Sequence, residues 1–161
     1  MNAESIENVE QIKSSLQDLI YRLQDAEKGY EEIKKASNNL IVNKWLDAYA
    51  KERHLMHFVL EEEMKNLGGD PEVKSTFLGE IHRMFIDVKI NATSNHAEFN
   101  AIVDEIDRGA SLLISEYEKV IEEVEMPSSI KKILIGQKLI VEKELSTLTS
   151  LRDEINSETI A

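Results

Sequence analysis

Several glutamates lie in or beside the apolar stripes of long helical segments, where a carboxylate could bind a metal ion. Glu27 lies beside the stripe of the first segment, Glu52 and Glu63 belong to the second, and Glu144 belongs to the last. Carboxylates that project into a helical bundle are typical of iron or manganese centres. We predict Glu27, Glu52 and Glu144 as candidate metal ligands. Charged pairs that fix helix register would use the same residues, and the sequence favours this structural interpretation.

Arg53 and a pair of histidines follow Glu52 on the second segment. Arg53 would neutralise Glu27 across the helix interface if the two residues share a layer, and we predict that Glu27 pairs with Arg53 or with another cation. His54 and His57 are three residues apart, so with Glu61 one turn further they could hold a Zn²⁺ ion at the surface. The sequence favours a solvated helix face for both histidines.

Three interruptions divide the chain into the elements that must position these residues. They are Ser37-Asn38-Asn39, Gly68-Gly69-Asp70-Pro71 and Met126-Pro127-Ser128-Ser129. Glycine after a helix end, followed by proline, is a strong stop signal. The pattern predicts bundle helices over about 5–36, 40–67, 96–125 and 130–156, with another helix over about 72–92. The stripe of the first helix repeats every three or four residues and consists of Val9, Ile12, Leu16, Leu19, Leu23, Ala26, Tyr30 and Ile33.

The segment 72–92 decides the topology of this all-α chain. Its roughly 21 residues would span about 30 Å as a helix, which is most of the length of a bundle. A crossover of that length returns the chain to its starting end, so residues 101–124 would run parallel to residues 46–67. We therefore predict one domain over residues 1–161, a ferritin-like four-helix bundle whose long crossover carries an extra helix. A five-helix up-and-down bundle is the alternative.

Composition limits the classes of function. The 161-residue chain has 19 basic and 31 acidic residues, for a formal net charge of −12. Such a surface repels phosphate backbones, so we expect no nucleic-acid partner. The chain has no cysteine, which excludes disulfides and thiolate metal sites. It has no apolar run of membrane-spanning length and no secretory signal, and we expect a cytoplasmic protein.

A set of ordered motifs carries a resemblance over about residues 16–153. The motifs are LQDLIYRLQDAEKGY, YAKERH, LGGDPE, IHRMFIDVKI, IDRGA followed by EYEKV, and SLRDEI. Together they resemble a bacterial domain-of-unknown-function family in the ferritin-like superfamily. The resemblance implies a ferritin-like bundle with a split third helix, and it implies no known activity.

The di-iron members of that superfamily offer a test of the metal hypothesis. They place one Glu on each of two helices and a Glu-x-x-His motif on each of the other two. In this chain Leu55 and Thr147 stand where the histidines should follow Glu52 and Glu144, and Ala110 stands where an inward Glu is expected. We therefore predict no di-iron centre, and the incomplete ligand set favours a protein without enzymatic activity over an enzyme.

Three classes of function remain open on the sequence. The first is a non-enzymatic bundle that acts through protein contacts, for example in stress or envelope physiology. The second is a metal-binding bundle that uses iron or manganese for oxidase chemistry or metal handling. The third is a dimeric scaffold without a ligand.

Overall fold

Four long helices make up the computed structural model, which describes residues 3–73 and 95–160. They are α1 (Ala3–Ala36), α2 (Leu40–Asn66), α4 (Asn95–Glu123) and α5 (Ser128–Ile160). No strand occurs in the two described ranges. The helix predicted for residues 72–92 lies almost entirely outside the described residues. None of the described helices contains a stretch long and apolar enough to cross a membrane.

The α1–α2 turn is short because one side chain caps the second helix. Asn39 has extended backbone angles, and its side-chain oxygen accepts hydrogen bonds from the backbone N–H groups of Ile41 and Val42. These N–H groups have no partner within the helix, so the cap replaces bonds that would otherwise be lost. Asn43 donates from its side chain to the carbonyl of Ser37, 3.0 Å away, which fixes the turn from the other side.

The glycine pair predicted to stop α2 does so by a defined geometry. Gly68 has a φ of 77°, a left-handed conformation that costs glycine little. Its neighbour Gly69 donates to the carbonyl of Met64, 2.9 Å away, and a Cβ on Gly69 would lie 2.7 Å from Met64 Cγ. The chain then passes alongside α1, where the backbone N–H of Glu72 donates to Gln17 Oε1.

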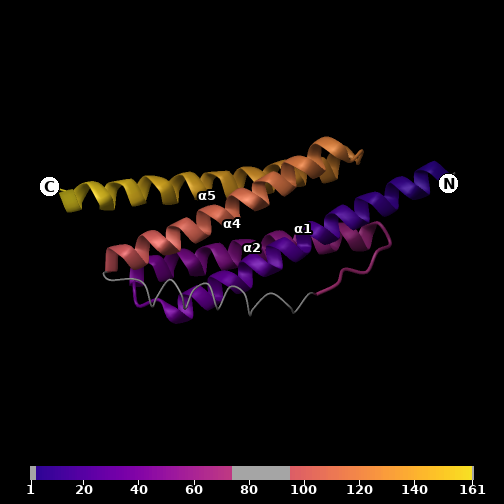
Figure 1. Ribbon diagram of the computed structural model, residues 1–161. Helices are drawn as coiled ribbons and strands as arrows, with labels where there is room; N and C mark the ends of the chain where they lie inside the picture. Colours follow the sequence, from indigo (N-terminus) through magenta and orange to yellow (C-terminus); the bar gives the residue numbers. More distant parts are fainter. Residues whose placement is uncertain (1–2, 74–94, 161) are drawn as a thin grey trace.

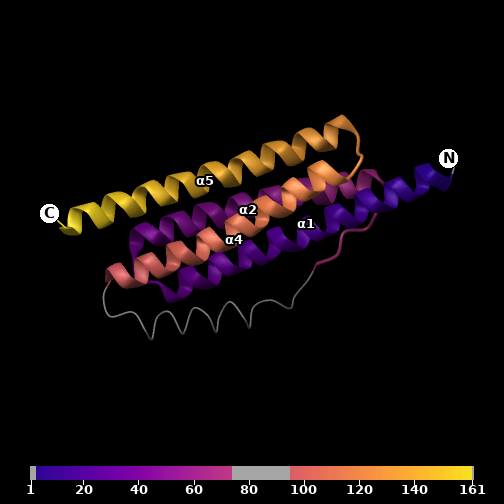
Figure 2. The same cartoon turned by 45° about the horizontal axis from the view of Figure 1, so that its top comes forward.

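The helices run in the directions that the predicted crossover topology requires. Figures 1 and 2 show α2 and α4 running in the same direction, and α1 and α5 running together in the opposite one. Leu67, at the end of α2, packs against the same apolar cluster as Val124, just after α4. The parallel arrangement predicted for residues 46–67 and 101–124 is therefore present.

The core consists of two apolar clusters that lie at opposite ends of the bundle. All four helices contribute to each cluster. The first contains Leu16, Leu23, Met56, Leu60, Leu113, Tyr117 and Leu134. The second contains Tyr30, Ile33, Leu46, Phe99, Ile102 and Leu148. Along the sequence of each helix, Glu27, Arg53 and Glu144 fall between the segments that form the two clusters. The charged residues singled out by the sequence therefore lie in a polar layer at the middle of the bundle.

Candidate metal centre

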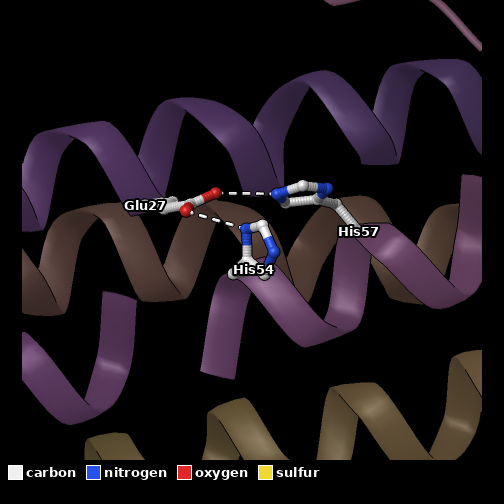
Figure 3. A group of neighbouring side chains, drawn as sticks. All are labelled: Glu27, His54 and His57. Carbon is white, nitrogen blue, oxygen red and sulfur yellow. Dashed lines mark hydrogen bonds and ion pairs between the residues drawn. The ribbon is translucent and has the colours of Figure 1, made fainter. Parts of the chain in front are cut away.

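Glu27 of α1 faces two histidines of α2 in this layer. Its Oε2 lies 2.7 Å from His57 Nε2, and its Oε1 lies 3.0 Å from His54 Nδ1. Figure 3 shows the carboxylate facing both rings, with one oxygen directed at each. The two histidines are three residues apart on α2, so they project from the same side of the helix. Their ring centroids are 4.9 Å apart, with the ring planes 78° from parallel.

The two histidines differ sharply in exposure. His57 is 7% exposed, whereas the side chain of His54 is 59% exposed. The side chain of Glu27 is 20% exposed. The prediction that both histidines lie on a solvated face is therefore wrong for His57, because α1 packs over that flank of α2. The site has one wall in the protein interior and one side open to solvent.

A second carboxylate holds His57 from behind. Glu61, one turn further along α2, accepts at Oε1 from His57 Nδ1 over 2.7 Å. Gln24 of α1 donates to the same oxygen over 3.3 Å. A carboxylate on the far nitrogen orients an imidazole and makes it a better metal ligand. Glu61 thus fits the role of a supporting residue, while the sequence placed it among the possible ligands of a surface zinc site.

His57 lies between two carboxylates. Its Nε2 faces Glu27 and its Nδ1 faces Glu61, each over 2.7 Å. A metal ion at Nε2 would take the place of the Glu27 contact, while the Glu61 contact would continue to hold the ring.

The donor set fits a divalent transition metal. The ligand atoms of Glu27, His54 and His57 all lie within 4.8 Å of one another. Two imidazoles and one carboxylate suit Zn²⁺ and Fe²⁺, and three protein ligands leave coordination positions open. An open groove of about 810 Å³ runs along α1 and α2 and is lined by Glu27 and His54. Solvent therefore has access to the open side of the site.

Arg53 pairs with a different acid from the one predicted. Its guanidinium nitrogen Nη2 lies 2.7 Å from Glu144 Oε2, so the expected Glu27–Arg53 ion pair is wrong. Arg53 is 1% exposed and lies over the ring of Tyr30, 5.8 Å from its centroid. The α2 register places Arg53 toward α5, while the adjacent His54 and nearby His57 face α1.

The charges of this buried pair respond to the apolar surroundings. Burial lowers the pKa of Arg53, but Tyr30 and Glu144 act against burial and leave it raised. Burial raises the pKa of the Glu144 carboxyl, which Arg53 opposes without cancelling. A metal ion at Glu144 would have to displace a guanidinium ion that is always charged. The interior acid is therefore already neutralised.

The three predicted carboxylate ligands thus go to different surroundings. Glu27 joins the two histidines, Glu144 pairs with Arg53, and Glu52 is half-buried on α2. Among the described residues, the metal-sized group is Glu27, His54 and His57. No single site that uses all three carboxylates is formed by these contacts.

The three positions where a di-iron site would need further ligands differ in burial. Ala110 is buried, as the comparison assumed, but Leu55 is 57% exposed and Thr147 is exposed. Leu55 and Thr147 therefore lie on the outside of the bundle. Histidines at these two positions would not reach the interior.

The comparisons with known proteins agree with this fold. Residues 11–123 match the model of a family described as "Domain of unknown function (DUF2383)", so the chain belongs to that family. A solved structure of a Mycobacterium smegmatis Dps1 mutant matches with a TM-score of 0.72 and 15% sequence identity. The match covers 91% of this chain and 97% of the other. No curated protein matches the chain. The family resemblance and the ferritin-like fold expected from the sequence are both confirmed.

Proposed function

We propose that this protein binds one divalent transition-metal ion between α1 and α2, with Glu27, His54 and His57 as the ligands. The observation that carries the proposal is the Glu27 carboxylate, which directs one oxygen at a ring nitrogen of each histidine. A metal ion would replace the hydrogen-bonded contacts with coordinate bonds to the same atoms. The proposal concerns binding, and it assigns no chemical step to the site.

The surroundings of the site support an ion of the zinc or ferrous iron type. Imidazole ligands favour these ions, whereas Mg²⁺ and Ca²⁺ prefer sites made entirely of oxygen. Manganese, which the sequence suggested from carboxylates alone, fits this donor set less well because manganese suits oxygen ligands. The groove beside His54 leaves room for water on the remaining coordination positions.

Coordination at this site uses the lone pair of His57 Nε2, so this nitrogen carries no hydrogen once the ion is bound. Glu61 would keep its contact with Nδ1, 2.7 Å away, and hold the ring in place.

The experiment is isothermal titration of tag-free protein with Zn²⁺ and, without oxygen, with Fe²⁺. We expect one ion per chain for the native protein and loss of that binding in Glu27→Gln and His57→Gln. Glu52→Gln is the matched control, because it removes a half-buried carboxylate of α2 that lies outside the cluster. Unchanged binding in both cluster variants, or loss of binding in Glu52→Gln, would contradict the proposal.

A further inference from the structure

The outward face of α2 carries a second pattern, which includes large apolar side chains that the fold does not bury. Its members recur at steps of three and four residues, and they are Asp47, Lys51, Leu55, Phe58, Glu62 and Lys65. The side chain of Asp47 is 42% exposed, and the other members are exposed as whole residues. This spacing forms a seam along one side of a helix, as in the contact positions of a coiled coil. The seam lies on the side away from the buried face of α2. At one end Asp47 also pairs with Lys34 of α1 over 2.7 Å, but packing within the chain does not bury the exposed apolar residues at its middle.

The middle of the seam is apolar and strongly exposed. Leu55 is 57% exposed and Phe58 is 51% exposed, and Val59 beside them is 39% exposed. Three large apolar side chains side by side on a helix surface form a patch of the kind that marks an interaction site. Burying them would remove apolar surface from water and favour association.

The seam matches a second copy of itself that runs in the opposite direction. Consider two antiparallel α2 helices, with the two-fold axis at the level between Met56 and His57. Residues at equal distances before and after this level then face each other. Leu55 of one copy faces Phe58 of the other, so the apolar patches of the two copies meet at the centre.

The charges on either side of the apolar patch are complementary in the same arrangement. In the next layer Lys51 faces Glu62. In the layer beyond it Lys65 comes within one residue of the level of Asp47, a difference of about 1.5 Å along the helix. A lysine side chain is long and flexible enough to cover that difference. The layers of the seam therefore pair apolar with apolar at the centre and positive with negative on both sides.

This arrangement is specific for the antiparallel direction. In a parallel pair each residue would face its own counterpart, so Lys51 would face Lys51 and Glu62 would face Glu62. Like charges that face each other across an interface are unfavourable. The seam also stays neutral, with two acids and two lysines, although the whole chain carries a charge of −12. A second copy could therefore approach this face without the repulsion that the rest of the surface produces.

We propose that two copies of this chain associate through the outward faces of their α2 helices. The helices pack antiparallel about a two-fold axis at the level between Met56 and His57. Such a contact is isologous, because the same patch serves both subunits. The intrachain pairs on this face are compatible with it. Lys51 already contacts Asp47 at 2.9 Å and Lys65 contacts Glu62 at 2.7 Å, so each interchain contact extends an existing pair.

The first test is the mass of the full-length protein by sedimentation equilibrium, with a chelator present so that metal has no effect. We expect the native protein to form a dimer and Phe58→Glu to be monomeric. Leu139→Glu is the matched control, because Leu139 of α5 is 55% exposed and lies outside the seam. A monomeric native protein would overturn the proposal. So would a dimer that persists in Phe58→Glu or dissociates in Leu139→Glu.

A charge exchange separates loss of the interface from loss of the fold. Lys51→Glu and Glu62→Lys should each raise the dimer dissociation constant by about tenfold, because each replaces two attractive contacts with repulsive ones. Combining the two substitutions should restore the native dissociation constant. Circular dichroism would verify that each variant keeps its helix content. Failure of the double variant to recover would contradict the pairing.

Cross-linking tests the direction of the helices, because the chain has no cysteine of its own. Two single variants, Lys51→Cys and Glu62→Cys, are mixed and treated with a short thiol-reactive cross-linker. We expect a covalent dimer in the mixture and none in either variant alone, since equivalent residues would lie about 16 Å apart along the helix. Efficient cross-linking of either variant with itself would show a parallel contact and overturn the proposal.

Discussion

Two groups of charged and polar residues occupy the middle layer of this bundle, and they differ in how completely the protein buries them from solvent. Arg53 and Glu144 lie inside, with exposed side-chain fractions of 1% and 17%, and each neutralises the other. Glu27, His54 and His57 lie at the α1–α2 edge, where His54 is 59% exposed. The inner pair uses a permanent cation. The edge group uses imidazoles, which can give up a proton and accept a metal ion.

This difference separates a structural role from a binding role among residues that look alike in the sequence. A guanidinium ion has no lone pair to offer a metal and does not lose its charge. It fixes α2 against α5 and leaves the inner acid with a partner. The edge carboxylate has only titratable partners, one of them open to solvent, so exchange with a metal ion needs no rearrangement of the core.

The largest loss of stability is expected when the inner cation, Arg53, is removed. Arg53→Met should lower the free energy of unfolding by about 3–5 kcal/mol, because it leaves Glu144 buried without its partner. Urea denaturation followed by circular dichroism measures the loss. The double variant Arg53→Met, Glu144→Leu should recover most of it, since no unpaired charge remains. A loss below about 1 kcal/mol for the single variant would mean that the Arg53–Glu144 pair behaves like a solvent-exposed ion pair.

A smaller loss of stability is expected when Glu27 of the edge group is changed. In chelator, Glu27→Gln should lower the free energy of unfolding by about 1–2 kcal/mol, because the two histidines lose a charged acceptor while water can still reach the site. The same urea titration gives the value, with Glu52→Gln as the control for a half-buried carboxylate outside the cluster. A urea midpoint for Glu27→Gln equal to or higher than that of the native protein would contradict this prediction. It would indicate that Glu27 is destabilised by neighbouring acids and is not stabilised by the two histidines.

Stability at alkaline pH tests the burial of Tyr49, which lies near the inner pair. Burial raises the pKa of Tyr49 from 10.0 to about 12, with a smaller contribution from Glu144. The unfolded chain therefore loses this proton at lower pH than the folded protein does, so stability should fall as the pH rises from about 10 to about 12. Tyr49→Phe should reduce that dependence. Unfolding curves across this range that show no difference between the two proteins would contradict the burial of the phenol.

The fold could be predicted from the sequence because its signals are local. The apolar repeat of α1 and the glycine pair after α2 each act within a few residues, and they define long helices. The length of the segment between Leu67 and Asn95 then favoured the crossover topology. These features depend on the periodicity of the chain and on backbone geometry, which sequence patterns record directly.

The partners in the middle layer could not be predicted in the same way. Glu27 was found because it lies beside an apolar stripe, but the partner assigned to it, Arg53, was wrong. The pairing depends on how α2 is rotated about its own axis between α1 and α5, and a rotation of one residue changes which side chain faces which helix. His57 was missed as a buried residue for the same reason, since its flank is buried by α1.

The central claim is that Glu27, His54 and His57 bind a metal ion, and thermal unfolding with and without Zn²⁺ tests it most directly. A ligand present at 100 times its dissociation constant stabilises the folded state by about 2.7 kcal/mol. We expect a clear rise in the melting temperature of the native protein and of Glu52→Gln. The rise should be absent in His57→Gln and Glu27→Gln. A native protein that melts at the same temperature with and without Zn²⁺ and Fe²⁺ would contradict the account.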